Sequence, residues 1–161
     1  MQVTIRPIEA KDNRELAVII RKTLEEFGAN HPGTVYYDPT TDHLFELFEK
    51  PKSRYWVVEG IDGRLFGGAG IFPTEGLPAG TCELVKLYLL PETRGLGLGR
   101  QLMDICHQTA KTLGFTQLYL ETMPELTSAV PLYEKMGYRF LKGALGNSGH
   151  FGCAIHMLKV L

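Results

Sequence analysis

The sequence predicts an α+β fold in which one mixed β-sheet carries helices on both faces. Two long segments repeat apolar residues at the 3.6-residue period of an amphipathic helix, and they end near Phe27 and Leu113. Short β-rich runs lie between and after these segments, and glycine, proline or an Asp-Gly pair punctuates them. The 161 residues, 44% of them hydrophobic, have the length and composition of one globular domain covering residues 1–161.

The chain begins with an expected strand and an expected helix. Residues 3–6 (VTIR) form the strand, which ends at the following proline. Asp12 and Glu15 have the spacing of a capping box, and an apolar helical stripe from Leu16 to Phe27 follows them. Gly28 comes directly after this stripe, where a helix commonly needs a left-handed cap residue.

The next part of the chain predicts a loop, a short helix and a β-hairpin. Residues 29–41 contain two prolines and a glycine and therefore predict a loop. The apolar residues of 44–48 indicate a short helix that packs inward. Two β-rich runs, 54–59 and 65–72, flank Asp62-Gly63, and an Asp-Gly pair in this position is a strong hairpin signal.

The second half of the chain predicts strands that alternate with two further helices. Residues 81–90 form a long buried strand, and residues 99–113 form an amphipathic helix that ends at a glycine. Thr127 or Ser128 caps a helix that runs to Met136. The remaining expected strands are residues 116–121, 138–142 and 153–160.

The charge balance, the cysteines and the N-terminal residues favour a cytoplasmic protein without a nucleic-acid or membrane partner. The 17 Lys and Arg residues are balanced by 18 Asp and Glu residues, whereas a general nucleic-acid binder has a basic excess. The 3 cysteines are widely spaced and form no disulfide or metal-binding pattern. No segment resembles a signal peptide, and no apolar run approaches the roughly 18 residues of a membrane span.

The 5 histidines lack the spacing of metal ligands, so the sequence predicts no metal site. His107 is expected on the solvent side of the helix at 99–113. His156 shares a strand face with Leu158 and Val160, which favours a core position with its polar atoms satisfied.

The segment Arg94-Gly95-Leu96-Gly97-Leu98-Gly99-Arg100 lies between a buried strand and a helix. A helix N-terminus presents free N–H groups and a positive dipole end, and glycines let an anion approach the backbone closely. These features favour a phosphate site over a turn that uses glycine for its geometry alone. Neither a Walker A loop nor a dinucleotide fingerprint matches, because the required third glycine of the fingerprint is Arg100.

Two segments resemble motifs of the GNAT (GCN5-related) N-acetyltransferases. Residues 87–99 (LYLLPETRGLGLG) resemble motif A, Arg/Gln-x-x-Gly-x-Gly/Ala, with Arg94, Gly97 and Gly99 at its fixed positions. Residues 129–138 (AVPLYEKMGY) resemble motif B, Ala-x-x-Leu/Phe-Tyr-x-x-x-Gly-Phe/Tyr, at the expected distance along the chain. The resemblance implies the GNAT-like acyl-CoA N-acyltransferase fold over nearly the whole chain, with a mixed, mostly antiparallel sheet.

One residue departs from the family pattern. Leu126 stands where many members have an asparagine three residues before motif B, so a side-chain amide contact to the cofactor is not implied.

The resemblance also implies acetyl-CoA as the acetyl donor and a set of residues that bind it. Its pyrophosphate would lie on the backbone N–H groups of the glycine-rich turn. Its pantetheine arm would add to the preceding strand like an extra β-strand, because that strand is expected to separate from residues 116–121. The implied cofactor-binding residues are Leu87, Tyr88, Leu89, Arg94, Gly95, Leu96, Gly97, Leu98, Gly99 and Arg100.

Two residues are candidates for catalysis. Tyr133 matches the family tyrosine that protonates the departing CoA thiolate, although helical periodicity alone favours an ordinary core tyrosine. Glu83 shares a strand face with Val85, Leu87 and Leu89 by alternation, and an apolar environment would raise its pKa into the range of a general base. A water-facing carboxylate at the end of a strand is the alternative for Glu83, and a bulge would break the alternation.

Two polar loops, residues 29–41 and 143–152, are expected to line the acceptor side of the cleft. Their candidate substrate residues are Tyr36, Tyr37, Asp38 and His150. These groups suit a compact polar amine, so we expect acetylation of a small-molecule primary amine by direct attack. A peptide N-terminal acetyltransferase, an acyl-CoA-binding module with weak or no catalysis, and a nucleotide-binding protein are the alternatives. The oligomeric state stays open, a homodimer included.

Overall fold

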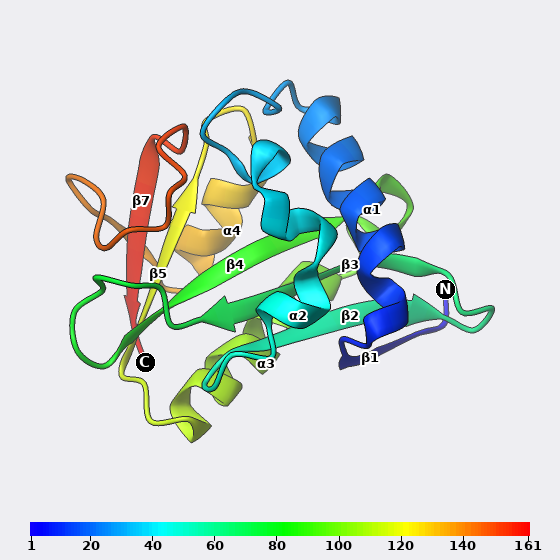
Figure 1. Cartoon of the computed structure of the whole chain (residues 1–161), viewed down its shortest axis with the longest axis horizontal. Helices are drawn as coiled ribbons and strands as arrows, with labels where there is room; N and C mark the ends of the chain where they lie inside the picture. Colours follow the sequence, from blue (N-terminus) through cyan, green and yellow to red (C-terminus); the bar gives the residue numbers. More distant parts are fainter.

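The structure, a computed structural model, describes residues 1–161 and contains one seven-stranded sheet with helices on both faces (Figure 1). The strand order is β1-β2-β3-β4-β5-β7-β6, and only the neighbours β4 and β5 are parallel. The strands are β1 (Val3–Pro7), β2 (Arg54–Gly60), β3 (Leu65–Phe72), β4 (Thr81–Leu89), β5 (Gln117–Thr122), β6 (Arg139–Phe140) and β7 (Ile155–Val160). This mixed, mostly antiparallel sheet confirms the predicted fold class.

Four α-helices cover the sheet, two on each face (Figure 1). They are α1 (Asn13–Glu26), α2 (Leu44–Leu47), α3 (Leu98–Thr112) and α4 (Ala129–Lys135), and the 3-10 helices are η1 (Ala10–Asp12), η2 (Val35–Tyr37), η3 (Pro39–Asp42) and η4 (Pro91–Thr93). The side chains of α1 and α2 form one buried core with the sheet, and those of α3 and α4 form another. Each helix therefore buries its apolar stripe as the sequence pattern predicts.

Most expected elements are present, with differences at the ends and in the loops. The Asp62-Gly63 pair joins β2 to β3 in an antiparallel hairpin, as predicted. The expected loop at residues 29–41 contains most of the two short 3-10 helices η2 and η3, and the short helix at 44–48 is a single turn. The expected strand at 138–142 is reduced to two residues, and the strand predicted at 153–160 starts at Ile155.

The first helix does not begin with the expected capping box of Asp12 and Glu15. The buried carboxylate of Asp12 accepts hydrogen bonds from Arg6 at 2.8 and 3.0 Å and from the backbone N–H of Glu9. Glu15 instead accepts a hydrogen bond from the backbone N–H of Leu65 at 2.7 Å. Asp12 therefore bonds to residues that precede the helix, and Glu15 bonds to the start of β3, so the two carboxylates do not form a capping box.

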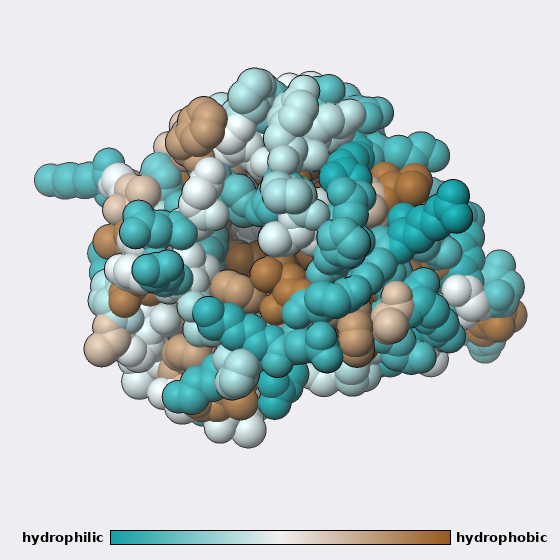
Figure 2. Space-filling view, viewed as in Figure 1, coloured by the Kyte–Doolittle hydropathy of each residue, from teal (hydrophilic) through white to brown (hydrophobic).

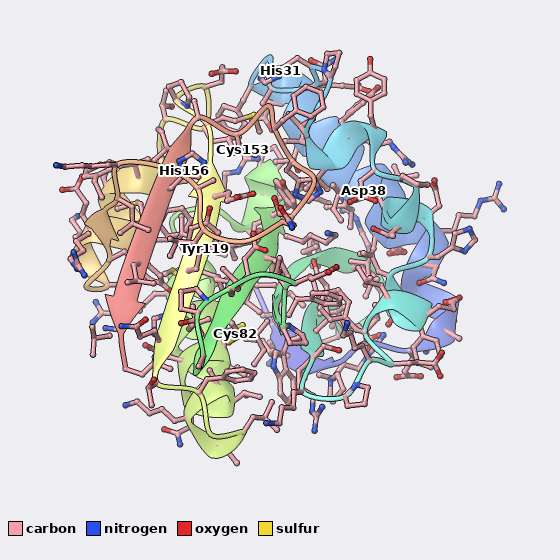
Figure 3. The ribbon with its side chains drawn as sticks, turned by 60° about the vertical axis from the view of Figure 1, so that its left-hand side comes forward. His31, Asp38, Cys82, Tyr119, Cys153 and His156 are labelled. Carbon is pink, nitrogen blue, oxygen red and sulfur yellow. The ribbon has the colours of Figure 1, made fainter.

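Two histidines lie in environments that differ from the predictions. His107 is buried on α3, where Nε2 is 2.8 Å from the hydroxyl of Tyr138, so it does not face solvent. The loss of hydration lowers the pKa of His107 to about 4. His156 is half-buried rather than a core residue, and its ring stacks on Tyr119 of the neighbouring strand at 6.4 Å (Figure 3).

A β-bulge interrupts the alternation of side chains along β4. Gly70 of β3 pairs with Val85, but Gly68 pairs with Tyr88, so two residues of β4 oppose one of β3. Lys86 occupies the bulge with a left-handed φ of 53°, and its carbonyl accepts a hydrogen bond from the buried Tyr55 hydroxyl at 2.8 Å. The bulge therefore turns the second half of the strand over relative to the first.

Strands β4 and β5 separate after three paired positions. Their parallel register runs from Thr81–Gln117 to Glu83–Tyr119 and then stops. The β5-facing backbone of β4 beyond Glu83 therefore has no strand partner. This separation, expected from the family resemblance, opens the sheet at its centre.

Candidate active site

The opening beside β4 contains a largely apolar groove with a volume of about 160 Å³. Strand β4, helix α4 and the end of helix α1 form its walls. The lining residues are Thr23, Phe27, Leu87, Tyr88, Leu89, Arg94, Gly99, Leu126, Ser128, Ala129, Leu132 and Tyr133. An extended, mostly apolar ligand can lie here and hydrogen-bond to the exposed edge of β4.

The glycine-rich turn lies at the end of this groove and begins helix α3. Gly95 and Gly97 both have a left-handed φ of 78°, and a Cβ atom at either position would meet open space. No backbone N–H from Gly95 to Arg100 donates a hydrogen bond within the protein. The turn therefore presents free donors at the positive end of the α3 dipole, which is the physical basis of an anion site.

The two arginines of the turn have different roles. Arg94 donates hydrogen bonds at 2.5 and 2.9 Å to Glu26 and also to the carbonyl of Leu89, and its guanidinium lies over the ring of Phe27. These contacts hold the turn against α1 and largely neutralise the positive charge of Arg94. Arg100 is exposed and has no ion-pair partner, so it is the free cation of the pair.

Tyr133 projects from α4 into the same groove and has no hydrogen-bond partner within the protein. Its side chain is 7% exposed, and burial raises the pKa of its phenol. The hydroxyl is therefore protonated at neutral pH and available to a bound ligand. In this position Tyr133 can donate a proton, and it also packs against Tyr138 as a core residue does.

A second, polar pocket of about 260 Å³ lies on the α2 side of β4. Figure 2 shows this face of the molecule hollowed near its centre, with apolar side chains inside and hydrophilic ones around the rim. The lining residues are Asp38, Thr40, Leu47, Phe48, Lys50, Phe72, Thr74, Glu75, Glu83, Val85, Lys86, Asn147, Ser148 and His150. A smaller cavity of about 40 Å³ shares Glu83, Lys86 and His150 with this pocket and Tyr88 with the apolar groove.

Glu83 is the buried carboxylate of the polar pocket. It is 4% exposed and accepts a hydrogen bond from the Thr74 hydroxyl at 2.5 Å. Burial raises the pKa of Glu83 to about 7, with the hydrogen bond from Thr74 acting in the opposite direction. A carboxyl group with this pKa is matched to proton transfer near neutral pH.

Strict alternation along β4 predicts that Glu83 shares a face with Val85, Leu87 and Leu89. This prediction is correct for Val85 and wrong for Leu87 and Leu89. Val85 and Tyr88 pack with the α1 core, whereas Leu87 and Leu89 pack with the core of α3 and α4. The bulge at Lys86 explains the difference, because it shifts the alternation by one residue.

The two predicted acceptor loops meet through Asp38 and His150. Nε2 of His150 is 2.8 Å from Oδ2 of Asp38, and Asp38 also caps η3 by accepting hydrogen bonds from Thr40. These contacts hold the pKa of Asp38 well below its usual range. Figure 3 shows Asp38 on its loop beside the segment that precedes β7. This Asp38–His150 pair, which joins the two loops at the polar pocket, is called the clasp below.

The other two candidates from these loops lie outside the pocket. The hydroxyl of Tyr36 donates a hydrogen bond to Glu25 of α1, and Tyr37 is 60% exposed. The aromatic pair therefore packs on the outer side of the loop, and only Asp38 and His150 reach the cavity.

Sequence reasoning missed three polar residues at the site. Lys86 lines both the polar pocket and the small cavity, where strict alternation would have placed it on the opposite face from Glu83. Thr74 reaches Glu83 from the segment after β3, and Glu121 of β5 accepts hydrogen bonds from Tyr119 and Ser148. No local pattern signals the contacts of Thr74 with Glu83 and of Ser148 with Glu121, because each joins separate elements of the chain.

The described residues contain no cluster of three or more His, Cys, Asp or Glu side chains that could hold a metal ion. None of the helices combines the length and the apolar character needed to cross a bilayer.

The architecture is shared with solved acetyltransferases. A GNAT-family acetyltransferase of Staphylococcus aureus Mu50 superimposes with a TM-score of 0.86 at 19% identity, covering 99% of each chain. A phosphinothricin acetyltransferase of Sinorhizobium meliloti, crystallised with acetyl-CoA, gives a TM-score of 0.77 at 22% identity, covering 100% of this chain and 89% of the other. The fold is therefore that of the GNAT acyltransferases.

Sequence comparison leads to the same class. Residues 19–138 match the model of the acetyltransferase (GNAT) family. The N-acetyltransferase YjgM of Escherichia coli K12 is 38% identical over 158 residues, which cover 98% of this chain and 94% of that protein. The chain belongs to the GNAT family and is an acetyl-CoA-dependent N-acetyltransferase.

Proposed function

We propose that this enzyme transfers the acetyl group of acetyl-CoA directly to the primary amine of a small molecule. The observation that carries the proposal is the polar pocket of about 260 Å³, which contains a buried carboxylate and is bordered by the Asp38–His150 clasp. This volume lies just below the roughly 300–1,000 Å³ typical of small-molecule sites. An extended peptide would need an open channel across the two loops that the clasp joins.

The apolar groove and the glycine-rich turn form the proposed donor site. The free N–H groups from Gly95 to Arg100 hold the pyrophosphate, and the exposed side chain of Arg100 adds a positive charge. The unpaired edge of Leu87–Leu89 holds the pantetheine arm by main-chain hydrogen bonds. A backbone N–H of the same stretch can stabilise the negative charge that develops on the thioester oxygen.

Glu83 and Tyr133 supply the two proton transfers of the proposed reaction. Glu83 takes a proton from the acceptor ammonium, directly or through a water molecule, so that the neutral amine attacks the thioester carbon. A C–N bond forms, the C–S bond breaks, and Tyr133 donates its proton to the departing thiolate. The attacking nitrogen then loses its second proton, which returns Tyr133 to its protonated form directly or through a water molecule. Burial keeps Tyr133 protonated until the C–S bond breaks, and the same apolar groove also raises the pKa of a bound thiol.

We also propose a cytoplasmic location for the enzyme. Cys82, Cys106 and Cys153 are all free and buried, which supports a reducing, cytoplasmic location for the enzyme.

An acceptor survey tests the proposal. Acetyl-CoA turnover is measured by thiol release with a panel of small amines and with short peptides that carry free or blocked α-amines. Turnover of small amines at rates equal to or above those of the peptides is expected. Turnover confined to peptides with a free α-amine would overturn the small-molecule assignment. Tight acetyl-CoA binding without turnover of any amine would instead identify an acyl-CoA-binding module.

A further inference from the structure

Lys86 is a buried cation without a direct partner. Its side chain is 9% exposed, and its ammonium makes no hydrogen bond or ion pair with any protein group. It lines both the polar pocket and the small cavity that leads to the donor groove. Burial lowers the pKa of Lys86, because a buried charge is costly unless it is paired. A bound anion would stabilise the charged form of Lys86, so the pocket favours an anionic ligand.

The carboxylates nearest to Lys86 have other partners. Asp38 accepts hydrogen bonds from His150 and from the backbone and side chain of Thr40. Glu83 accepts one from Thr74 and is partly protonated near neutral pH, because burial raises its pKa to about 7. Neither carboxylate makes an ion pair with Lys86, so both favour its charged form only from a distance, and no protein group pairs with it directly.

We propose that the acceptor is an amino acid or a similar amino carboxylate, whose carboxylate pairs with Lys86 while its amine faces Glu83. This inference rests on the proposed function, since it concerns the same pocket. Glu83 and Lys86 lie three positions apart on β4 and line the same two cavities. A zwitterion therefore matches the site, with its ammonium toward the base and its carboxylate toward the lysine.

A single carboxylate fits this site better than a phosphate group. Lys86 is the one buried cation of the pocket, and Lys50 lies exposed at the mouth, where its ammonium is 5.5 Å from the centre of the Phe72 ring. The free backbone donors that favour phosphate belong to the glycine-rich turn on the donor side. One ammonium pairs with one carboxylate and repels a second cation on the ligand.

The test compares amino acids with their α-carboxamides, which keep the amine and lose the negative charge. Initial rates with glycine, alanine, glutamate and the other amino acids are measured against the matched amides for wild type, Lys86→Met and Lys50→Met. Methionine keeps the length of the stem without the charge. Because an amide also changes the basicity of the amine, the informative quantity is the amino acid to amide ratio of kcat/KM in each variant.

We expect wild type to favour at least one amino acid over its amide, and Lys86→Met to reduce that ratio by about 30-fold or more, mainly through KM. Lys50→Met should leave the ratio within about threefold, as for an exposed charge at the rim. Acetyl-CoA binding by calorimetry must be retained in Lys86→Met, which shows that the variant is folded.

Three outcomes overturn the inference. The first is that wild type acetylates simple amines without any preference for a carboxylate. The second is that Lys86→Met leaves both rates and the amino acid to amide ratio unchanged. The third is that Lys86→Met lowers the rates with the amino acid and with its amide equally. The last result assigns Lys86 a structural role. A complete lack of turnover with every amine would instead overturn the proposed function, so the two failures are distinguishable.

Discussion

The two halves of the site are built from different chemical groups, although both border strand β4. The donor side consists mainly of backbone: the free N–H groups of the Gly95–Arg100 turn and the unpaired edge of Leu87–Leu89. The acceptor side consists of side chains from separate elements, among them Glu83, Lys86 and His150. In the proposed function, the backbone groups bind the constant ligand acetyl-CoA, and the side chains specify the acceptor. The comparison can be tested by changing one group at a time.

The largest expected effect follows from Glu83→Gln, which removes the base while keeping the size of the side chain. We expect kcat to fall by about 10³-fold, within the range of general acid–base catalysis. In wild type, kcat/KM should rise with pH through about 7, because Glu83 acts in its ionised form and its pKa is raised to about 7. The variant should lack this rise in a pH series.

Glu75→Gln is the matched control for this variant. Glu75 lies at the mouth of the same pocket but is exposed, so its loss should change kcat by less than about threefold. An unchanged pH profile in Glu83→Gln would transfer the role of base to another group.

Tyr133→Phe tests the donor side and should have the next largest effect. Removing the hydroxyl while keeping the ring should lower kcat by about 10²-fold, with little change in acetyl-CoA affinity. Tyr138→Phe is the control, because Tyr138 is buried beside Tyr133 but bonds to His107 and does not line the groove. Equal rates for Tyr133→Phe and wild type, with chemistry rate-limiting, would leave Tyr133 a packing residue.

Of the three substitutions, Gly97→Asp should have the smallest effect, and this effect should be on acetyl-CoA binding alone. A carboxylate at this position meets the bound pyrophosphate, and the left-handed φ of 78° disfavours any side chain, so the Kd of acetyl-CoA should rise tenfold or more. Gly114→Asp is the control at the other end of α3, where φ is 92° and space is equally open. Equal affinities in the two folded variants would contradict the assigned pyrophosphate site.

The sequence predicted the donor side more completely than the acceptor side. Glycine spacing between a strand and a helix is a local signal, and it predicted the turn. The resemblance to GNAT motifs A and B implied the groove strand and Tyr133, and the structure places all three around one groove. The one difference is Arg94, whose guanidinium bonds to Glu26 of α1 rather than standing free. That contact joins residues 68 positions apart and has no trace in the motif.

The acceptor side required the tertiary structure. Glu83 was found through an alternation that holds only as far as Val85, because the bulge at Lys86 then reverses the faces of β4. The same reversal hid Lys86, which alternation assigns to the wrong face. Asp38 and His150 come from two loops 112 positions apart, and composition suggested both without predicting that they pair.

The fold class was accessible because each element carries its own periodicity. The details that failed are side-chain contacts between different elements: Asp12 with Arg6, Glu15 with Leu65, and His107 with Tyr138. In each case a polar side chain makes its hydrogen bond to a group outside its own helix, so the sequence pattern of that helix does not predict the bond.

The small cavity beside β4 bears on whether both substrates are bound before the acetyl group is transferred. It borders both the donor groove and the acceptor pocket, so both substrates can occupy the enzyme at once. Its one thiol, Cys153, is buried, and burial raises its pKa to about 12, so an attacking thiolate is absent at neutral pH. An acetyl-enzyme on Cys153 is thereby disfavoured, and we expect the reaction to pass through a ternary complex. Double-reciprocal plots at several fixed acetyl-CoA concentrations should accordingly intersect rather than run parallel.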